Sequence, residues 1–214
     1  MKNLLIATEN PAKLQEIRRF LMDLPVELVG LKDLGIFDVV EETGKTFEEN
    51  AILKATFYSE KSGLPTVADD GGIEIDILGG EPGVQSRRWA GPENNEVHDL
   101  ESDERLIQYA LTRMKDFPEA KRGAQMRTVV AFSSPQGRVS TGEGTIRGII
   151  AIRPSEKRYL GFPFRSLFFL PEIRKFYNHD ELTEEENERY NHRKKALEKI
   201  KPIIRETILH YARH

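Results

Sequence analysis

The chain has 214 residues, of which 38% are hydrophobic and 31% charged, and its formal net charge is −3. This length suits one large domain or two closely joined lobes. The absence of cysteine excludes disulfides, thiolate metal sites and cysteine nucleophiles, and it fits a reducing cytoplasm. The small net charge provides no global basic field for a nucleic-acid polymer, and no apolar run is long enough for a membrane span.

The first half of the sequence alternates short apolar runs, typical of buried strands, with segments whose apolar residues recur at helical spacing. Pro11 at the start of one helical segment and a Thr46–Glu49 capping box at the start of the next support these helices. The predicted order is a strand at 4–7, a helix at 11–22, a strand at 26–29, a helix at 46–61 ending at Gly63, a strand at 64–68 and a helix at 95–115.

The second half begins with longer β segments. These are predicted at 126–132 and 139–152, joined by a turn at 134–137 that contains Pro135 and Gly137. Two helices are predicted to close the chain, at 184–201 and 203–211, separated at Pro202. Helices that alternate with strands and are followed by a β-ribbon indicate an α/β fold with a central mixed sheet flanked by helices.

The segment Asp69-Asp70-Gly71-Gly72 follows the predicted strand at 64–68. Paired carboxylates at the end of a buried strand suit Mg²⁺, which prefers oxygen ligands. Glycine beside them lets the backbone turn sharply and lets a ligand approach closely. An ordinary acidic β-turn explains the same four residues, because Asp-Gly is common turn chemistry. The two interpretations stay open on this segment alone.

A second polar segment lies where the first strand meets the first helix. Thr8, Asn10 and Lys13 surround a predicted helix N-terminus, which attracts phosphate through its free N–H groups and its dipole. The alternative is an N-cap asparagine with a surface lysine. Ligands of open α/β sheets bind at the carboxyl ends of strands, so parallel neighbouring strands would bring this segment, the aspartates and the Glu41–Glu42 pair to one edge. Phosphate with Mg²⁺ suits such an edge.

Four segments, at 7–13, 41–55, 64–72 and 78–91, follow one another with a distinctive order and spacing. In that order and spacing they resemble the inosine triphosphate pyrophosphatase family, also called Ham1-like. Near the C-terminus, Asn191-His192-Arg193 is similar to the Ser-His-Arg motif of that family. The resemblance implies a single domain over 1–214 with two lobes and a cleft between them, an architecture shared with Maf-like pyrophosphatases. It also implies a homodimer, in which Trp89 is either an interface or a core residue.

The resemblance assigns a role to each matching residue. The implied phosphate-binding and substrate-binding residues are Thr8, Asn10, Lys13 and Gly71. The implied Mg²⁺ ligands are Glu41 and Asp70, and Asp70 also acts in activating the attacking water. The implied supporting catalytic residues are Asp69 and Lys54, although a solvated helix lysine is the alternative for Lys54. The implied base contacts are His192 and Arg193.

The sequence departs from the family pattern where the base is expected. Gly161-Phe162-Pro163-Phe164-Arg165-Ser166 stands in place of Gly-Phe-Gly-Tyr-Asp-Pro, so Arg165 replaces an aspartate. Asn187 stands where the family has a lysine. Phe162 is kept for stacking on the base. A donor-only guanidinium favours a base edge rich in acceptors, unless Arg165 faces solvent or pairs with Glu186 or Glu188.

The resemblance implies Mg²⁺-dependent hydrolysis of a nucleoside triphosphate to a monophosphate and pyrophosphate. The implied substrates are non-canonical purine nucleotides, such as inosine and xanthosine triphosphates, in a cytoplasmic house-cleaning role, with altered base choice as the expected departure. Two alternatives stay open: a nucleotide-binding sensor that does not turn over, and a Maf-like nucleotide pyrophosphatase.

Overall fold

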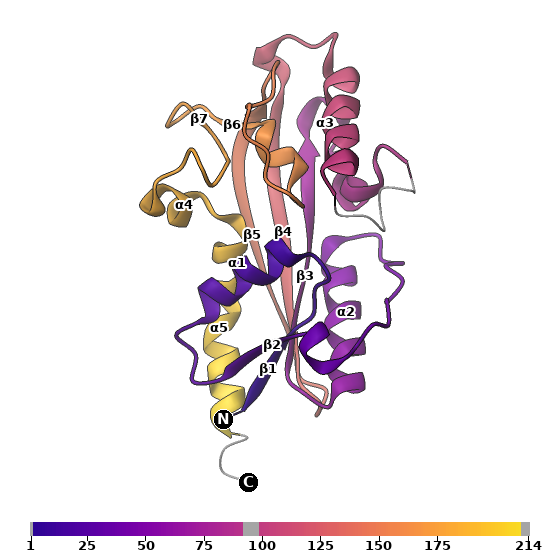
Figure 1. Cartoon of the computed structure of the whole chain (residues 1–214), viewed down its shortest axis with the longest axis vertical. Helices are drawn as coiled ribbons and strands as arrows, with labels where there is room; N and C mark the ends of the chain where they lie inside the picture. The colour runs from indigo at the N-terminus through magenta and orange to yellow at the C-terminus, as the bar shows by residue number, and fades with distance from the viewer. Residues whose placement is uncertain (1, 92–98, 211–214) are drawn as a thin grey trace. The chain divides into compact units, whose positions relative to one another are not determined.

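The computed structural model describes residues 2–91 and 99–210 and has the predicted α/β fold. One mixed sheet of seven strands has the order β2-β1-β3-β4-β5-β6-β7 (Figure 1). The strands are β1 (Asn3–Ile6), β2 (Glu27–Gly30), β3 (Thr66–Ile75), β4 (Gly123–Ser133), β5 (Val139–Ile150), β6 (Phe168–Leu170) and β7 (Lys175–Phe176). The helices are α1 (Pro11–Leu21), α2 (Phe47–Ser62), α3 (Leu100–Met114), α4 (Glu184–Tyr190) and α5 (His192–His210).

The chain divides into two compact units. The first unit comprises Met1–Asp70, Thr128–Gly144 and Arg193–His214, and the second comprises Gly71–Arg127 and Thr145–His192. Three strands, β3, β4 and β5, contribute residues to both units. Each unit has its own hydrophobic core, so each is described by itself.

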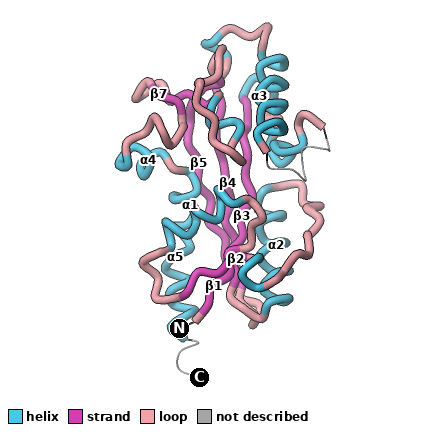
Figure 2. Tube along the Cα trace, in the orientation of Figure 1, coloured by secondary structure: helices cyan, strands magenta, loops and turns pink. Residues whose placement is uncertain are grey.

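The first unit contains the parallel part of the sheet, in which β1 pairs with both β2 and β3. Helices α1 and α5 lie next to each other on one side of these strands, and α2 lies on the other side (Figures 1 and 2). Ile17 of α1 and Ile200 of α5 share a buried cluster with Leu4 and Ile6 of β1. Helix α2 begins at the predicted Thr46–Glu49 capping box, and Gly63 ends it in the left-handed conformation.

Strand β3 is longer than the predicted segment 64–68, because it continues through both aspartates and both glycines to Ile75. The acidic-turn interpretation of Asp69-Asp70-Gly71-Gly72 is therefore wrong, as is the placement of the aspartates at a strand end. Gly72 serves close packing: a Cβ there would lie 2.0 Å from the Ser86 Oγ. That hydroxyl accepts a hydrogen bond from the Ile73 N–H at 3.0 Å, so the glycine lets the Ser86 segment approach the strand.

The second unit packs α3 and its strands around a separate core that includes Ile73, Leu106 and Phe168. Trp89 packs against this core and meets the Tyr109 ring edge-on at 5.3 Å, which supports the core interpretation of the tryptophan. Helix α3 starts at Leu100 with Asp99 as its N-cap, and the predicted helical residues 95–98 lie outside the described residues.

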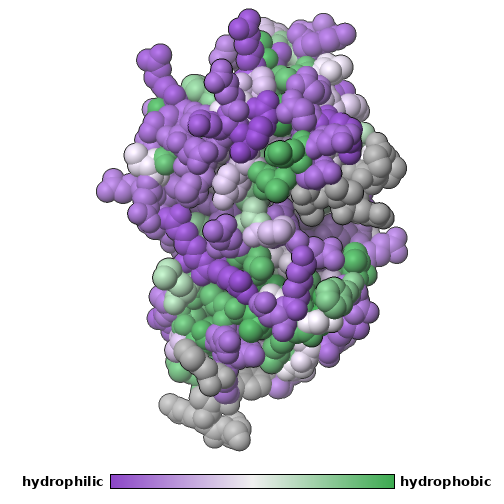
Figure 3. All heavy atoms as spheres, viewed as in Figure 1, coloured by the Kyte–Doolittle hydropathy of each residue, from purple (hydrophilic) through white to green (hydrophobic). Residues whose placement is uncertain are grey.

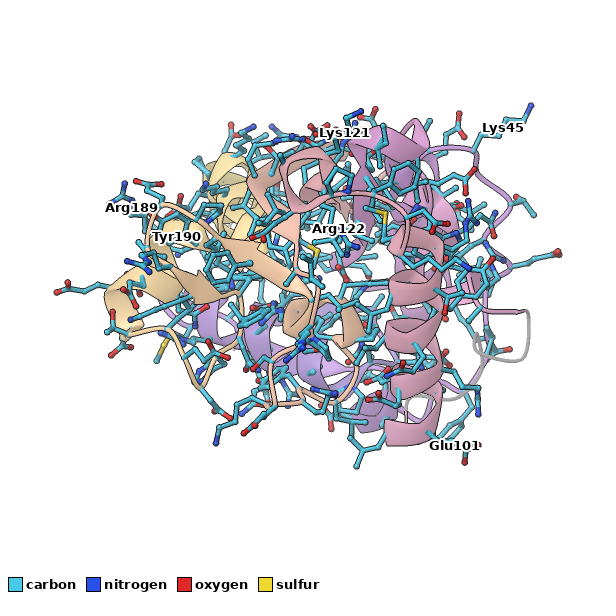
Figure 4. All side chains as sticks on the ribbon, turned by 90° about the horizontal axis from the view of Figure 1, so that it is seen from above. Lys45, Glu101, Lys121, Arg122, Arg189 and Tyr190 are labelled. Atoms are coloured by element: carbon cyan, nitrogen blue, oxygen red, sulfur yellow. The ribbon has the colours of Figure 1, made fainter. Side chains whose placement is uncertain are left out.

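Arg122 is a buried structural arginine of the second unit. Its guanidinium donates hydrogen bonds to the backbone oxygens of Met114, Phe117 and Ala151, and burial lowers its pKa. Arg122 is 3% exposed; in Figure 4 it lies within the outline of the molecule, whereas the neighbouring Lys121 lies near its edge. The side chain therefore joins the end of α3 to the segment that follows β5.

The C-terminal helices do not separate where the sequence predicts. The break falls at Asn191, whose backbone is extended (φ −78°, ψ 109°), and Pro202 lies inside the continuous helix α5. A proline inside a helix removes one backbone hydrogen bond but does not always end the helix, since packing of the remaining turns holds them together. Here α5 buries Ala196, Leu197, Ile200 and Ile204 on both sides of the proline.

The surface is rich in polar groups. On the face drawn in Figure 3, hydrophilic side chains predominate over the part formed by the second unit. Among the described residues, no helix combines the length and the apolar character needed to cross a membrane.

Candidate active site

Asp69 and Asp70 make contact with different helices of the first unit. Consecutive side chains of a strand point to opposite faces of the sheet. The Asp69 carboxylate lies 3.2 Å from the ammonium of Lys13 on α1 and accepts a hydrogen bond from Arg193 on α5 at 3.1 Å. The Asp70 carboxylate instead faces α2, where it accepts a hydrogen bond from Asn50 at 3.1 Å. The two aspartates thus have separate environments.

Asp69 is held in a buried ion network. Its side chain has no exposed surface, and Arg193, which is only 3% exposed, also pairs with Glu16 of α1. Burial acts to raise the pKa of Asp69, but Lys13 and Arg193 outweigh it and hold the pKa well below its ordinary value. The Asp69 carboxylate is therefore charged at neutral pH. This network joins β3 to α1 and α5, which gives Asp69 and Arg193 structural partners within the first unit.

Asp70 belongs to a second group of charges together with Lys54 and Glu42. The Lys54 ammonium lies 2.6 Å from the Glu42 carboxylate and 3.7 Å from that of Asp70. Burial acts to lower the pKa of Lys54, but the charges of Asp70 and Glu42 outweigh it and raise the pKa. The pKa of Asp70 is raised, first by burial and then by the nearby Glu42 charge, against the opposing effect of Lys54. Two carboxylates therefore share one buried cation.

The resemblance assigns Glu41 to the metal, but the structure places its neighbour Glu42 beside Lys54. Glu42 is half-buried and contacts Lys54, whereas Glu41 is exposed. The acidic group beside Asp70 is therefore Glu42 rather than Glu41. Asn50 is a further residue that the sequence analysis missed: it is fully buried, donates to Asp70 and accepts from the Gly44 N–H at 2.7 Å. A polar residue within the buried stripe of α2 is the sequence signal for it.

The N-terminus of α1 is capped from within. The Asn10 side chain accepts hydrogen bonds from the N–H groups of Ala12 at 2.9 Å and Lys13 at 3.3 Å. The Asn10 N–H in turn donates to the Thr8 hydroxyl at 3.3 Å. Thr8 and Asn10 thus act as the cap of this helix, which is the plainer of the two interpretations. The Lys13 ammonium supplies the positive charge at this end of the helix.

A cluster of aromatic rings in the second unit surrounds Arg165. This aromatic cluster consists of Tyr159, Phe162, Tyr177 and the guanidinium of Arg165. The guanidinium carbon of Arg165 lies 3.9 Å from the centre of the Phe162 ring, 4.7 Å from that of Tyr177 and 5.7 Å from that of Tyr159. Arg165 is only 3% exposed, so the interpretation in which it faces solvent is wrong.

His192 extends this cluster, whereas Arg193 does not. The Tyr177 hydroxyl lies 3.1 Å from Nδ1 of His192, and both side chains are buried. The two neighbouring residues that the resemblance assigns to the base therefore have different surroundings: His192 contacts the aromatic cluster of the second unit, and Arg193 contacts Asp69 in the first. Asn187 is also buried, and its Oδ1 has no hydrogen-bond partner in the described part of the chain.

Comparisons with known proteins match nearly the whole length of the chain. The model of the Ham1 family matches residues 4–203. The chain belongs to the Ham1 family. It is 36% identical over 210 residues to a dITP/XTP pyrophosphatase of Yersinia pseudotuberculosis, covering 96% of this chain and 100% of the relative. It is 39% identical over 201 residues to a dITP/XTP pyrophosphatase of Geobacter sulfurreducens, covering 94% and 96%.

Solved structures agree with the family assignment. The HAM1 protein of Coxiella burnetii superposes with a TM-score of 0.79 at 31% identity, covering 96% of this chain and 100% of that protein. The Ham1 protein of Staphylococcus aureus gives a TM-score of 0.78 at 30% identity with the same coverage. The predicted family and the α/β fold with its mixed sheet are thereby confirmed.

The acidic residues of this Ham1 chain fit a divalent cation that is completed by substrate. Among the described residues, no group of three or more histidine, aspartate and glutamate side chains is arranged to hold a metal ion. Mg²⁺ commonly uses only one or two protein carboxylates and takes its other ligands from water and substrate phosphates. Glu42 and Asp70 are two carboxylates close to one ammonium, and their oxygens are the ligands that would hold such a cation.

Proposed function

We propose that this Ham1-family protein hydrolyses nucleoside triphosphates to nucleoside monophosphates and pyrophosphate. The names of its relatives support non-canonical purine nucleotides, dITP and XTP among them, as the substrate class. Removing such nucleotides is a house-cleaning activity. The observation that carries the proposal is the charged group of Lys54, Glu42 and the buried Asp70, with Lys13 in the same unit.

Glu42 and Asp70 would hold the metal, and Mg²⁺ is the ion that their oxygen ligands suit best. A bound Mg²⁺ neutralises phosphate oxygens and lowers the pKa of water. The phosphate-binding charges of the chain would be Lys13 and Lys54. Because Asp70 and Glu42 keep the pKa of Lys54 high, its ammonium stays charged at neutral pH. The chain thus presents cations to the phosphates and carboxylates to the metal.

In the proposed reaction, a water oxygen forms a bond to phosphorus and the phosphoanhydride bond to the leaving pyrophosphate breaks. The Asp70 carboxylate accepts the proton of the attacking water and later releases it to solvent. Asn50 fixes that carboxylate by donating to it at 3.1 Å. Lys54 stabilises the negative charge that develops on pyrophosphate, and losing one such preorganised donor costs about 3 kcal/mol, roughly a hundredfold in rate.

We assign the phosphate chemistry to Lys13, Lys54 and Asp70, and the recognition of the base to Phe162 and His192. Phe162 and His192 are the predicted base-binding residues that belong to the second unit. Gly71 follows Asp70 directly in β3 and is the predicted point of close ligand approach. Arg193, which contacts Asp69 and Glu16, would support the site through Asp69 rather than contact the base.

The test is the release of pyrophosphate from a panel of nucleoside triphosphates. We expect release from inosine, deoxyinosine and xanthosine triphosphates in the presence of Mg²⁺, and its loss when the metal is removed with EDTA and its return when Mg²⁺ is added. Orthophosphate is measured in parallel, because its release in place of pyrophosphate would contradict the proposed bond cleavage. Tight nucleotide binding without turnover of any member of the panel would favour a sensor.

A further inference from the structure

Arg165 contacts two rings of unequal burial. Tyr177 is 1% exposed and Arg165 is 3% exposed, while Phe162 is only partly buried. The guanidinium lies 3.9 Å from the Phe162 ring centre and 4.7 Å from that of Tyr177. Exposure therefore increases from Tyr177 through Arg165 to Phe162. The cation is therefore buried while the ring that it contacts most closely is partly exposed.

The segment that carries these groups is fixed at several points. The Gly161 N–H donates to Asp103 of α3 at 2.7 Å, and Gly161 has a left-handed φ of 82°. Within the segment, the Phe162 N–H donates to the Tyr159 oxygen at 2.9 Å and the Arg165 N–H donates to the Phe162 oxygen at 3.1 Å. Phe162 and Arg165 are thus held on consecutive turns of backbone. The cation–ring contact belongs to a rigid piece of the second unit.

The partly exposed ring of Phe162 is suited to stacking against the base of a nucleotide. Every base has a flat face, and stacking on an aromatic side chain holds it without regard to its edge. Tyr159 stacks on Phe162, with 5.5 Å between the ring centres and 9° between their planes, so a second aromatic ring supports the orientation of Phe162. A guanidinium stacked on an aromatic ring is attracted to its face and limits the rotation of that ring.

We propose that Arg165 is a positioning residue: it holds the Phe162 ring as a stacking platform for the substrate base and does not read the edge of the base. The inference rests on the proposed function, because it requires that the chain binds nucleotides. It assigns selectivity to groups other than Arg165, in contrast to the expectation that its donors choose an acceptor-rich edge. If so, replacing Arg165 should weaken the binding of all nucleoside triphosphates by a similar factor, whatever their base.

The variants Arg165→Met and Arg165→Lys test this role. Methionine keeps a long side chain without charge, and we expect it to raise KM for inosine, xanthosine, guanosine, adenosine and cytidine triphosphates by a similar factor of about 5 to 30, with kcat unchanged. Lysine keeps the attraction to the ring but not the flat stack, so its effect should be smaller. Arg113→Met is the matched control, since Arg113 also lies over two rings of this unit, Trp89 at 5.4 Å and Tyr109 at 5.9 Å.

A double-mutant cycle separates positioning from a merely structural role. In a Phe162→Ala background, Arg165→Met should add little to KM, because the ring through which Arg165 acts is absent. Inhibition by inorganic triphosphate, which has no base, should be unchanged in every variant. A changed ranking of the bases in Arg165→Met, or effects of the two substitutions that simply add, would overturn the inference.

The dissociation constant of a non-hydrolysable inosine triphosphate analogue, measured by calorimetry, should show the same pattern as KM. Circular dichroism and the melting temperature establish that each variant is folded, and if Arg165→Met does not fold, Arg165→Lys with the cycle decides the question. Wild-type protein that binds the analogue but releases no pyrophosphate would contradict the proposed function while leaving the Arg165 comparison intact. Wild-type protein that binds no nucleotide would contradict both.

Discussion

Replacing Arg193 with methionine should destabilise the protein strongly. The guanidinium pairs with Asp69 at 3.1 Å and also with Glu16, and the three side chains are 3%, 0% and 11% exposed. Removing one partner of a buried ion pair costs about 3–5 kcal/mol, because a charge is left buried without compensation. Lys13 remains beside Asp69 at 3.2 Å, which favours the lower end of that range.

The loss is large compared with the total stability of about 5–15 kcal/mol that is usual for a folded domain. For a chain of this size each kcal/mol corresponds to roughly 2–4 °C, so we expect the melting temperature to fall by about 6–20 °C. The measurement is thermal unfolding followed by circular dichroism, with urea unfolding as a second measure of the same change.

Arg205→Met is the matched control on the same helix. Arg205 pairs with Asp23 at 3.2 Å, but the two side chains are 50% and 53% exposed. Exposed pairs of this kind contribute about 0–1 kcal/mol, so this variant should melt within a few degrees of the wild type. Equal melting temperatures for the Arg193→Met and Arg205→Met variants would refute the reasoning, since burial would then have no influence on the value of the ion pair.

Three further substitutions test other parts of the structure. Asp70→Asn should reduce pyrophosphate release by at least about a hundredfold while circular dichroism stays unchanged, and near-normal turnover would contradict the role given to Asp70. Lys13→Ala should raise KM for every nucleoside triphosphate by a similar factor, whereas a strong dependence on the base would place Lys13 away from the phosphates. Gly72→Ala should cost about 1–3 kcal/mol in urea unfolding, because its Cβ would lie 2.0 Å from the Ser86 Oγ; full stability would show that the Ser86 segment shifts freely.

Elements whose signals are local could be predicted closely from the sequence. Helix α1 has its N-cap at Asn10 and its proline at the first position, and the prediction of 11–22 differs from the observed Pro11–Leu21 by one residue. Helix α2 is defined in the same way by Thr46 and Gly63. Caps lie next to the helices they end, so a short window of sequence contains the whole signal.

Elements whose signals depend on distant partners could not be predicted. The extent of β3 depends on Ser86, which lies thirteen residues beyond Ile73 in the chain and packs against Gly72. The continuity of α5 depends on the core that its residues on both sides of Pro202 join. Local rules assign a turn to the glycines and a break to the proline, and tertiary packing overrides both.

In the candidate site, too, local sequence patterns indicate some residues, while contacts between distant segments determine the partners of others. Local patterns indicated Lys13, beside a helix N-terminus, and the Asp69–Asp70 pair, and the family resemblance added Lys54; the roles of these residues stay predictions. The choice between Glu41 and Glu42 depends on which side chain faces Lys54, and a loop without periodicity does not reveal it. The partner of Arg193 is likewise set by the packing of α5 against α1 and β3, elements that lie far apart in the chain.

The adjacent aspartates Asp69 and Asp70 have different charged partners at hydrogen-bond or ion-pair distance. Because β3 is a strand at both positions, its two side chains leave on opposite faces, and each meets a different set of cations. Asp69 is neutralised by Lys13 and Arg193, so its charge is used to join α1 and α5 to the sheet. Asp70 shares a single lysine with Glu42 and therefore keeps an excess of negative charge. A divalent cation is attracted to an excess of negative charge, which supports our proposal that Asp70 holds the metal.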